Sequence, residues 1–245
     1  MKLPAKLLLL LLVIGSLATP SIGQDLAKTE QQFLKAYVSG SNTVWKISLQ
    51  QLENATDEPS QLLLAKGYYA AAGTAMGTQE EDLASDLLDK SAILTRQLLA
   101  NNEKLAEAHA LLSSVYGMKM GLSPMKGMIL GSKCNSAAEK AIQLAPNNGF
   151  TNYVKGSNLF YTPAMFGGDI EKSIEFLKKA KSSYEQAQQT NSWEYINMMT
   201  LLGQVYHKQK KYEEAESVFN AVLQIVPTYR YVKSYLLPKT QKAKS

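Results

Sequence analysis

Apolar and polar residues are arranged along this chain in the manner of helices rather than strands. From residue 25 onward there is no sustained alternation of apolar and polar positions, which a half-buried strand would show. Long segments are dominated by Leu, Ala, Glu, Gln and Lys, which favour helix. The pattern therefore predicts an all-α protein after the N-terminal segment.

The clearest internal unit spans residues 196–229 and has the pattern of a helical hairpin. Its expected packing positions are Leu202, Gly203, Tyr206, Tyr212, Ala215, Phe219 and Val222, with Pro227 ending the unit. Small residues at 203 and 215 let two antiparallel helices cross closely, and large residues fill the space beside them. These residue types at these spacings resemble the tetratricopeptide repeat (TPR), with Met199 at the position of the leading tryptophan.

Three earlier segments fit the same template less closely, and we expect Gly67 and Gly156 at the helix crossings of the first and third. Four hairpins over residues 59–230 predict a TPR-like α-solenoid, a right-handed superhelix of antiparallel helical hairpins. A capping helix is expected within residues 24–58, and a basic, solvated tail over 231–245.

The stretch "YTPAMFGGDIEKSI", residues 161–174, interrupts the helical pattern of the third unit. Pro163 cannot continue a helix, and Gly167 and Gly168 adopt positive φ at little cost. Asp169 is then placed to cap the next helix by accepting from the N–H of residue 171 or 172. The alternative is a loop that faces a ligand, in which case Phe166 and Asp169 are binding residues.

The segment from Pro163 to Asp169, with Ser173, also resembles the TPR-type T component of tripartite (TRAP) periplasmic transporters. The resemblance implies a periplasmic helical protein that assists a solute-binding protein or passes small ligands to it. That family usually carries a lipoprotein cysteine, whereas the single cysteine here is Cys134, which we expect to be a buried thiol.

The first 23 residues have the pattern of a secretory signal peptide. Lys2 and Lys6 precede an apolar run from Leu7 to Ile14, and small residues precede the cleavage that we expect after Gly23. The run is shorter than the ~20 residues that span a bilayer. We therefore expect an exported, periplasmic or secreted protein with no stable membrane span after cleavage; a retained anchor is the alternative.

Catalytic or metal chemistry has no support in the sequence. His109 and His207 are the only histidines, neither has metal-ligand spacing, and no HExxH, GxSxG or phosphate-loop motif occurs. After removal of the signal peptide 24 basic and 21 acidic residues remain, a balance too even for a nucleic-acid stripe. The expectation is a protein that is not an enzyme and has no catalytic residues, no metal site, no cofactor and no nucleic-acid partner.

A binding surface is the function that the pattern favours. In TPR arrays the first helix of each pair lines the concave groove, and polar groups beside aromatic ones suit an extended peptide or a small amphipathic ligand. A protein or peptide partner in the cell envelope is the first hypothesis, and a small molecule handled for solute uptake is the alternative. The candidate groove residues are Tyr153, Ser157, Phe160, Tyr161, Asn197, Thr200, Gln204 and His207.

Overall fold

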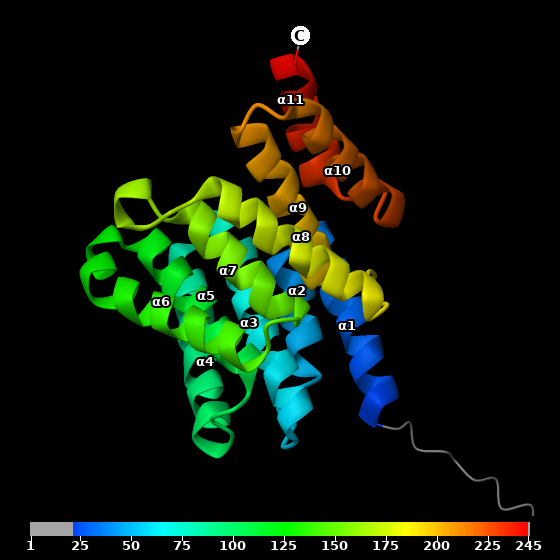
Figure 1. Ribbon diagram of the computed structural model, residues 1–245. Helices are drawn as coiled ribbons and strands as arrows, with labels where there is room; N and C mark the ends of the chain where they lie inside the picture. The colour runs from blue at the N-terminus through cyan, green and yellow to red at the C-terminus, as the bar shows by residue number, and fades with distance from the viewer. Residues whose placement is uncertain (1–21, 245) are drawn as a thin grey trace, which may run out of the picture.

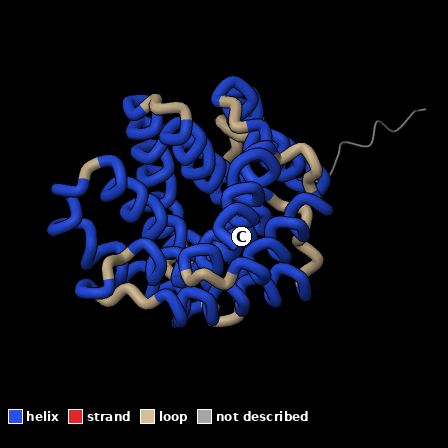
Figure 2. Tube along the Cα trace, turned by 90° about the horizontal axis from the view of Figure 1, so that it is seen from above, coloured by secondary structure: helices blue, strands red, loops and turns tan. Residues whose placement is uncertain are grey.

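A computed structural model describes residues 22–244, and every regular element in that range is a helix (Figure 1). The tube in Figure 2 shows helices joined by short loops, and no strand within the described residues. The predicted all-α architecture is confirmed. The predicted signal peptide lies almost wholly outside the described residues. Within them, no helix has the length and apolar character that a membrane span needs.

Four antiparallel helix pairs form the body of the molecule. They are α3 (Glu58–Gly77) with α4 (Glu81–Asn101), α5 (Ala106–Leu122) with α6 (Gly127–Leu144), α7 (Gly149–Tyr161) with α8 (Ile170–Gln186), and α9 (Trp193–Lys208) with α10 (Tyr212–Ile225). The two helices of each pair pack against each other, and each pair packs on the next. This is the predicted arrangement of successive helical hairpins.

Small residues lie where the helices cross, as the spacing predicts. A side chain at Gly203 would overlap the ring of Phe219 on α10, and Ala215 is fully buried. In the third pair a Cβ at Gly156 would lie 2.9 Å from Leu177 of α8. Close backbone approach is therefore a requirement of both crossings.

The role predicted for Gly67 is wrong. A Cβ at Gly67 would lie 2.5 Å from Phe33 and 2.8 Å from Leu49, and both of these residues belong to the N-terminal helices rather than to α4. The small residue makes room for the N-terminal cap. The spacing of residues within one hairpin cannot predict this contact, because Phe33 lies outside the hairpin.

The stretch at 161–174 forms a compact turn. Pro163 precedes the short helix η2 (Ala164–Phe166), and Gly167 has φ +94°. Gly168 does not adopt positive φ; a Cβ there would overlap the carbonyl oxygen of Thr162. The carboxylate of Asp169 accepts a hydrogen bond from the Lys172 N–H at 3.0 Å, which confirms the N-cap interpretation.

The described segments on either side of the four pairs differ from the prediction. The N-terminal cap consists of two helices, α1 (Ile22–Ser39) and α2 (Asn42–Gln50), which are separated at Gly40 with φ +62°. After α10, the expected solvated tail is instead ordered as the π-helical turn η3 (Val232–Leu236) and α11 (Leu237–Lys244), although most of its residues remain exposed. Buried Val232, Leu236 and Thr240 explain the packing of this segment, because they recur every four residues and so share one helix face, and the segment packs on α10.

The array curves so far that its first and last pairs meet. The first helices α3, α5, α7 and α9 contact one another in order, and α1 contacts both α3 and α9. The ammonium group of Lys66 on α3 lies 2.8 Å from the carboxylate of Glu194 on α9. The inner side of the solenoid is thus closed between these residues by side chains and by α1.

Candidate functional site

A hydrogen-bonded row of tyrosine and asparagine side chains fills the inner side of the array. Asn197 of α9 donates to the hydroxyl of Tyr153 on α7 at 2.8 Å, and its carbonyl accepts from the hydroxyl of Tyr37 on α1 at 2.9 Å. The ring of Tyr37 lies 5.5 Å from that of Tyr229. Burial, and after it the neighbouring phenol of Tyr229, raises the pKa of Tyr37 well above its ordinary value. These hydroxyls stay neutral and hold α1, α7 and α9 together.

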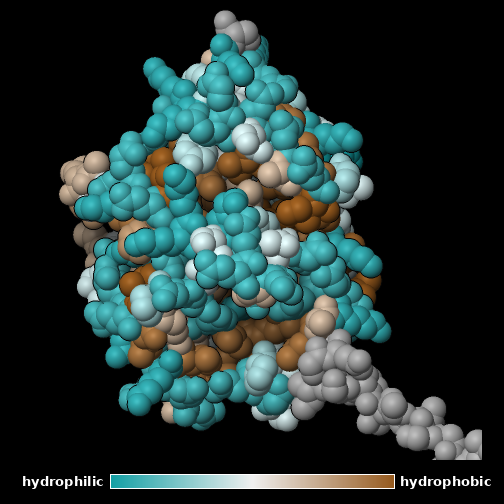
Figure 3. Space-filling model, turned by 45° about the vertical axis from the view of Figure 1, so that its right-hand side comes forward, coloured by the Kyte–Doolittle hydropathy of each residue, from teal (hydrophilic) through white to brown (hydrophobic). Residues whose placement is uncertain are grey.

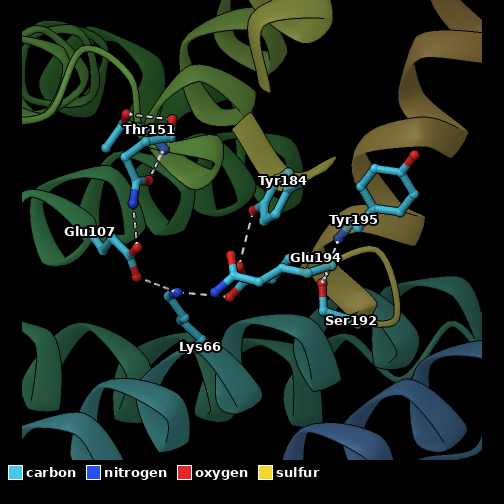
Figure 4. Close-up of polar contacts among 9 residues, drawn as sticks. Lys66, Glu107, Thr151, Tyr184, Ser192, Glu194 and Tyr195 are labelled. Atoms are coloured by element: carbon cyan, nitrogen blue, oxygen red, sulfur yellow. Dashed lines mark hydrogen bonds and ion pairs between the residues drawn. The ribbon is translucent and has the colours of Figure 1, made fainter. Parts of the chain in front are cut away.

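A charged cluster lies where α5, α7 and α9 begin (Figure 4). The buried ammonium group of Lys66 lies 2.6 Å from Glu107 and 2.8 Å from Glu194, and 4.4 Å from the ring centroid of Phe150. Burial alone would lower the pKa of Lys66, but the two carboxylates together raise it above its ordinary value. The lysine is therefore a permanent cation that links its own helix pair to the other three.

The partners of this lysine are held by further hydrogen bonds. The amide of Asn148, the N-cap of α7, donates to Glu107 at 2.6 Å, and the hydroxyl of Tyr184 donates to Glu194 at 3.0 Å. The charge of Lys66 lowers the pKa of Glu107. The cluster lines a cavity of about 230 Å³, and Glu30 of α1 lines it too. Glu30 is exposed as a whole residue, but burial of its carboxyl group, together with the charge of Glu194, raises its pKa.

An aromatic mouth lies at the opposite end of the first helices, where α7 and α9 end. We use this name for Phe160, Tyr161, Tyr231 and Tyr235. The rings of Phe160 and Tyr161 meet edge to face at 4.9 Å, and those of Tyr231 and Tyr235 stack at 5.7 Å. Tyr161 is 67% exposed as a whole residue, and burial of its hydroxyl group raises its pKa to about 12.

The mouth opens on a cavity of about 210 Å³ between α9 and the C-terminal segment. Gln204, His207 and Thr240 line it together with three of the aromatic residues. The Nδ1 atom of His207 lies 2.9 Å from the hydroxyl of Thr240, and burial lowers the pKa of the imidazole. On the face in Figure 3 most of the surface is hydrophilic, and hydrophobic side chains show mainly in hollows between ridges.

Comparison with known proteins bears on the hairpin that contains α9 and α10. Residues 196–229 match the family model of the tetratricopeptide repeat. The chain therefore contains a TPR repeat.

The architecture is that of a TPR solenoid in solved structures too. A thermophilic TPR protein of Thermus thermophilus has a TM-score of 0.52 and 15% identity over 89% of this chain and 97% of its own. The HusA haemophore of Porphyromonas gingivalis has a TM-score of 0.54 and 19% identity over 77% of this chain and 96% of its own. At such identities the likeness concerns the fold alone. No curated protein matches the sequence.

Two groups emerge from the residues that the sequence predicts for the TPR groove. Phe160, Tyr161, Gln204 and His207 lie together at the mouth or its cavity. Tyr153 and Thr200 are buried, and Asn197 is bonded to two tyrosines, so these three do not face an open groove as predicted. The physical reason is the closure of the array by α1 and by the contact between α3 and α9.

The remaining predicted residues, Ser157, Phe166 and Asp169, lie outside the linings of the two cavities. Ser157 is half-buried on α7, next to Gly156. Phe166 is 68% exposed on η2, and Asp169 caps α8.

Sequence reasoning missed Lys66, Glu107, Glu194, Tyr231 and Tyr235. The sequence held two signals for Tyr231 and Tyr235. Aromatic residues four positions apart share a helix face, and the apolar residues around these two also repeat every four positions. Nothing local marks Lys66, whose partners lie on two other hairpins. In the part of the chain that the structure describes, no group of His, Cys, Asp and Glu side chains has the arrangement of a metal site.

Proposed function

We propose that this chain is an exported, non-catalytic TPR-like protein, and that its aromatic mouth receives an apolar side chain of a protein or peptide partner in the cell envelope. The observation that carries the proposal is the aromatic mouth, where the exposed rings of Tyr231 and Tyr235 and the half-buried ring of Phe160 line a cavity of about 210 Å³. Clustered aromatic residues around a pocket are typical of the anchoring positions of protein interfaces. Export is supported by the pattern of the first 23 residues.

The cavity volume favours a side chain over a whole ligand. Small-molecule sites usually measure roughly 300–1,000 Å³, whereas the two cavities here measure about 210 and 230 Å³. Tyrosine is well suited to such an anchor site, because it gives contact area with few rotatable bonds and keeps a hydroxyl for hydrogen bonding.

Site-specific photo-crosslinking in the source cells tests the proposal. A benzoylphenylalanine at Tyr235, which is 53% exposed, should capture a defined partner. The same group at Ile47, 58% exposed on α2, is the matched control and should capture none. Absence of a product at position 235, or equal capture at position 47, contradicts the assignment of the mouth.

The handling of a small ligand for solute uptake is the second candidate. It is supported by the resemblance of residues 163–169 to the T component of TRAP transporters, and by the description of one fold neighbour as a haemophore. Native mass spectrometry of the protein purified from its source separates the two candidates. A co-eluting small molecule that Tyr231→Ala removes would favour the second, and a bare chain would favour the first.

A further inference from the structure

Five large apolar side chains are mostly exposed on the two enlarged connections of the array. We call them the apolar tips: Met125, Met128 and Ile129 after α5, and Met165 and Phe166 after α7, with exposed fractions of 67–94%. They lie on the short helices η1 (Pro124–Lys126) and η2 and in the first turn of α6. Such exposure of five large apolar residues calls for a partner, because isolated exposed residues are common but clusters are not.

Both connections lie at the same edge of the molecule. Helices α5 and α7 are neighbouring first helices of their pairs and pack on each other. Since both connections leave from the C-terminal ends of these helices, they project in the same direction. Figure 1 shows them together at the left edge, away from α1 and α11.

The charge of this edge is positive. No Asp or Glu occurs from residue 108 to 138, whereas Lys119, Lys126 and Lys133 do. The Lys119 ammonium pairs with Asp89, but Lys126 and Lys133 are exposed and form no ion pair within the described residues. The second connection has no charged residue before Asp169, whose carboxylate caps α8 and lies 3.3 Å from the ammonium group of Lys172. The two exposed lysines beside the apolar tips therefore favour a partner that is both apolar and anionic.

The shape of the edge favours a fluid partner. Each tip projects from the surface, and none lines either of the two cavities described above, whereas the core of a protein interface requires a close-packed complement. A lipid phase adapts to any shape, and apolar side chains beside lysines are the combination that binds at the headgroup boundary of anionic membranes.

We propose that the apolar tips insert into the headgroup boundary of an anionic lipid bilayer, with Lys126 and Lys133 against the phosphate groups. The apolar tips share no residue with the aromatic mouth, although both lie at the C-terminal end of α7, and the proposal does not rest on the proposed function. It assigns the molecule an orientation in which the ends of α5 and α7 face the membrane.

Tryptophan reporters in the chain that begins at residue 24, the product of the expected cleavage, test the insertion directly. Native Trp45 and Trp193 are each 1% exposed and give a constant background. With vesicles of phosphatidylcholine and phosphatidylglycerol, the emission of Phe166→Trp and Met128→Trp should shift to shorter wavelength and be quenched by brominated acyl chains. Vesicles of phosphatidylcholine alone should give a smaller shift, and each lysine replaced by alanine, at 126 or 133, should weaken binding about fivefold.

Ile93→Trp is the matched control, because Ile93 is 54% exposed on α4, away from the tips. Its emission should not change with either kind of vesicle. The proposal is overturned by an unshifted spectrum of Phe166→Trp with anionic vesicles, or by an equal shift of Ile93→Trp. Binding through any other segment gives one of these two results, so the reporters distinguish it from insertion of the tips.

Discussion

At the scale of single residues, Lys66 is a side chain on which contacts from three other helices converge. It joins Glu107 at the start of α5 to Glu194 at the start of α9 and lies over the ring of Phe150 on α7. Carboxylates in the first turn of a helix are favoured by the helix dipole. Lys66 thus links its own helix, α3, to the first helices of the other three pairs.

Replacement of this lysine by methionine should destabilise the fold strongly. Lys66→Met keeps the apolar stem but leaves two partly buried carboxylates without their cation, which should cost about 3–5 kcal/mol of unfolding free energy at neutral pH. Urea denaturation measures the loss. Lys90→Met, which removes an exposed pair with Asp86, is the control and should cost less than about 1 kcal/mol. Equal losses in the two variants would contradict the central role of Lys66.

Glu30 makes the stability of the same cluster depend on pH. Because burial raises its pKa above the ordinary value, its favourable contribution is complete below pH 4.5 and is lost as the pH rises through the folded-state pKa. Glu30→Gln should therefore be more stable than the native protein at pH 7, and the difference should vanish below about pH 4.5. Urea denaturation across this range checks it, with exposed Glu175→Gln on α8 as the control. A variant less stable than the native protein at pH 7 would show that the carboxylate is needed.

At the scale of elements, the turn between α7 and α8 shows how hydrogen bonds within a loop fix the conformation of that loop. Four backbone N–H groups, from residues 166 to 169, donate to carbonyl groups within the turn or at the end of α7. Asp169 caps α8, and Gly168 permits the approach of the Thr162 carbonyl. The turn satisfies its own polar groups, so its structure requires no ligand.

Gly168→Ala tests this account of the turn. The added methyl group meets a backbone carbonyl and not a flexible side chain, so the turn has to open and the melting temperature should fall by several degrees. Gly131→Ala on α6 is the matched control. A methyl group there would meet no neighbouring atom within 4 Å, and alanine should stabilise the helix by roughly 0.5–1 kcal/mol. An unchanged melting temperature of Gly168→Ala would mean that the turn is not held as described.

At the scale of the whole molecule, the contact between the first and last helix pairs distinguishes this chain from an open repeat array. In an open array each repeat contacts only its neighbours, so the ends unfold separately. Here α1 packs on both α3 and α9, and Lys66 pairs with Glu194. The closed arrangement couples the two ends of the array.

We therefore expect one cooperative unfolding transition. Trp45 lies in the N-terminal cap and Trp193 at the start of the last pair, so the single-tryptophan variants Trp193→Phe and Trp45→Phe report on the two ends. In each variant the fluorescence midpoint in urea should coincide with the midpoint of helix loss measured by circular dichroism. Phe33→Ala, which removes a buried contact of α1 with α3, should separate the two probes. Different midpoints for the two probes in chains that keep Phe33 would show that the ends are not coupled.

The sequence by itself determined the features that depend on neighbours along the chain. The helical hairpins, the small residues at 156 and 203, the cap at Asp169 and the buried thiol of Cys134 could all be predicted, because helix periodicity and capping act over a few residues. Only the tertiary structure decided the closure of the array, the role of Gly67 and the cluster at Lys66. These depend on contacts such as that of Tyr37 with Asn197, which are 160 positions apart, and on the curvature that accumulates as one helix pair stacks on the next.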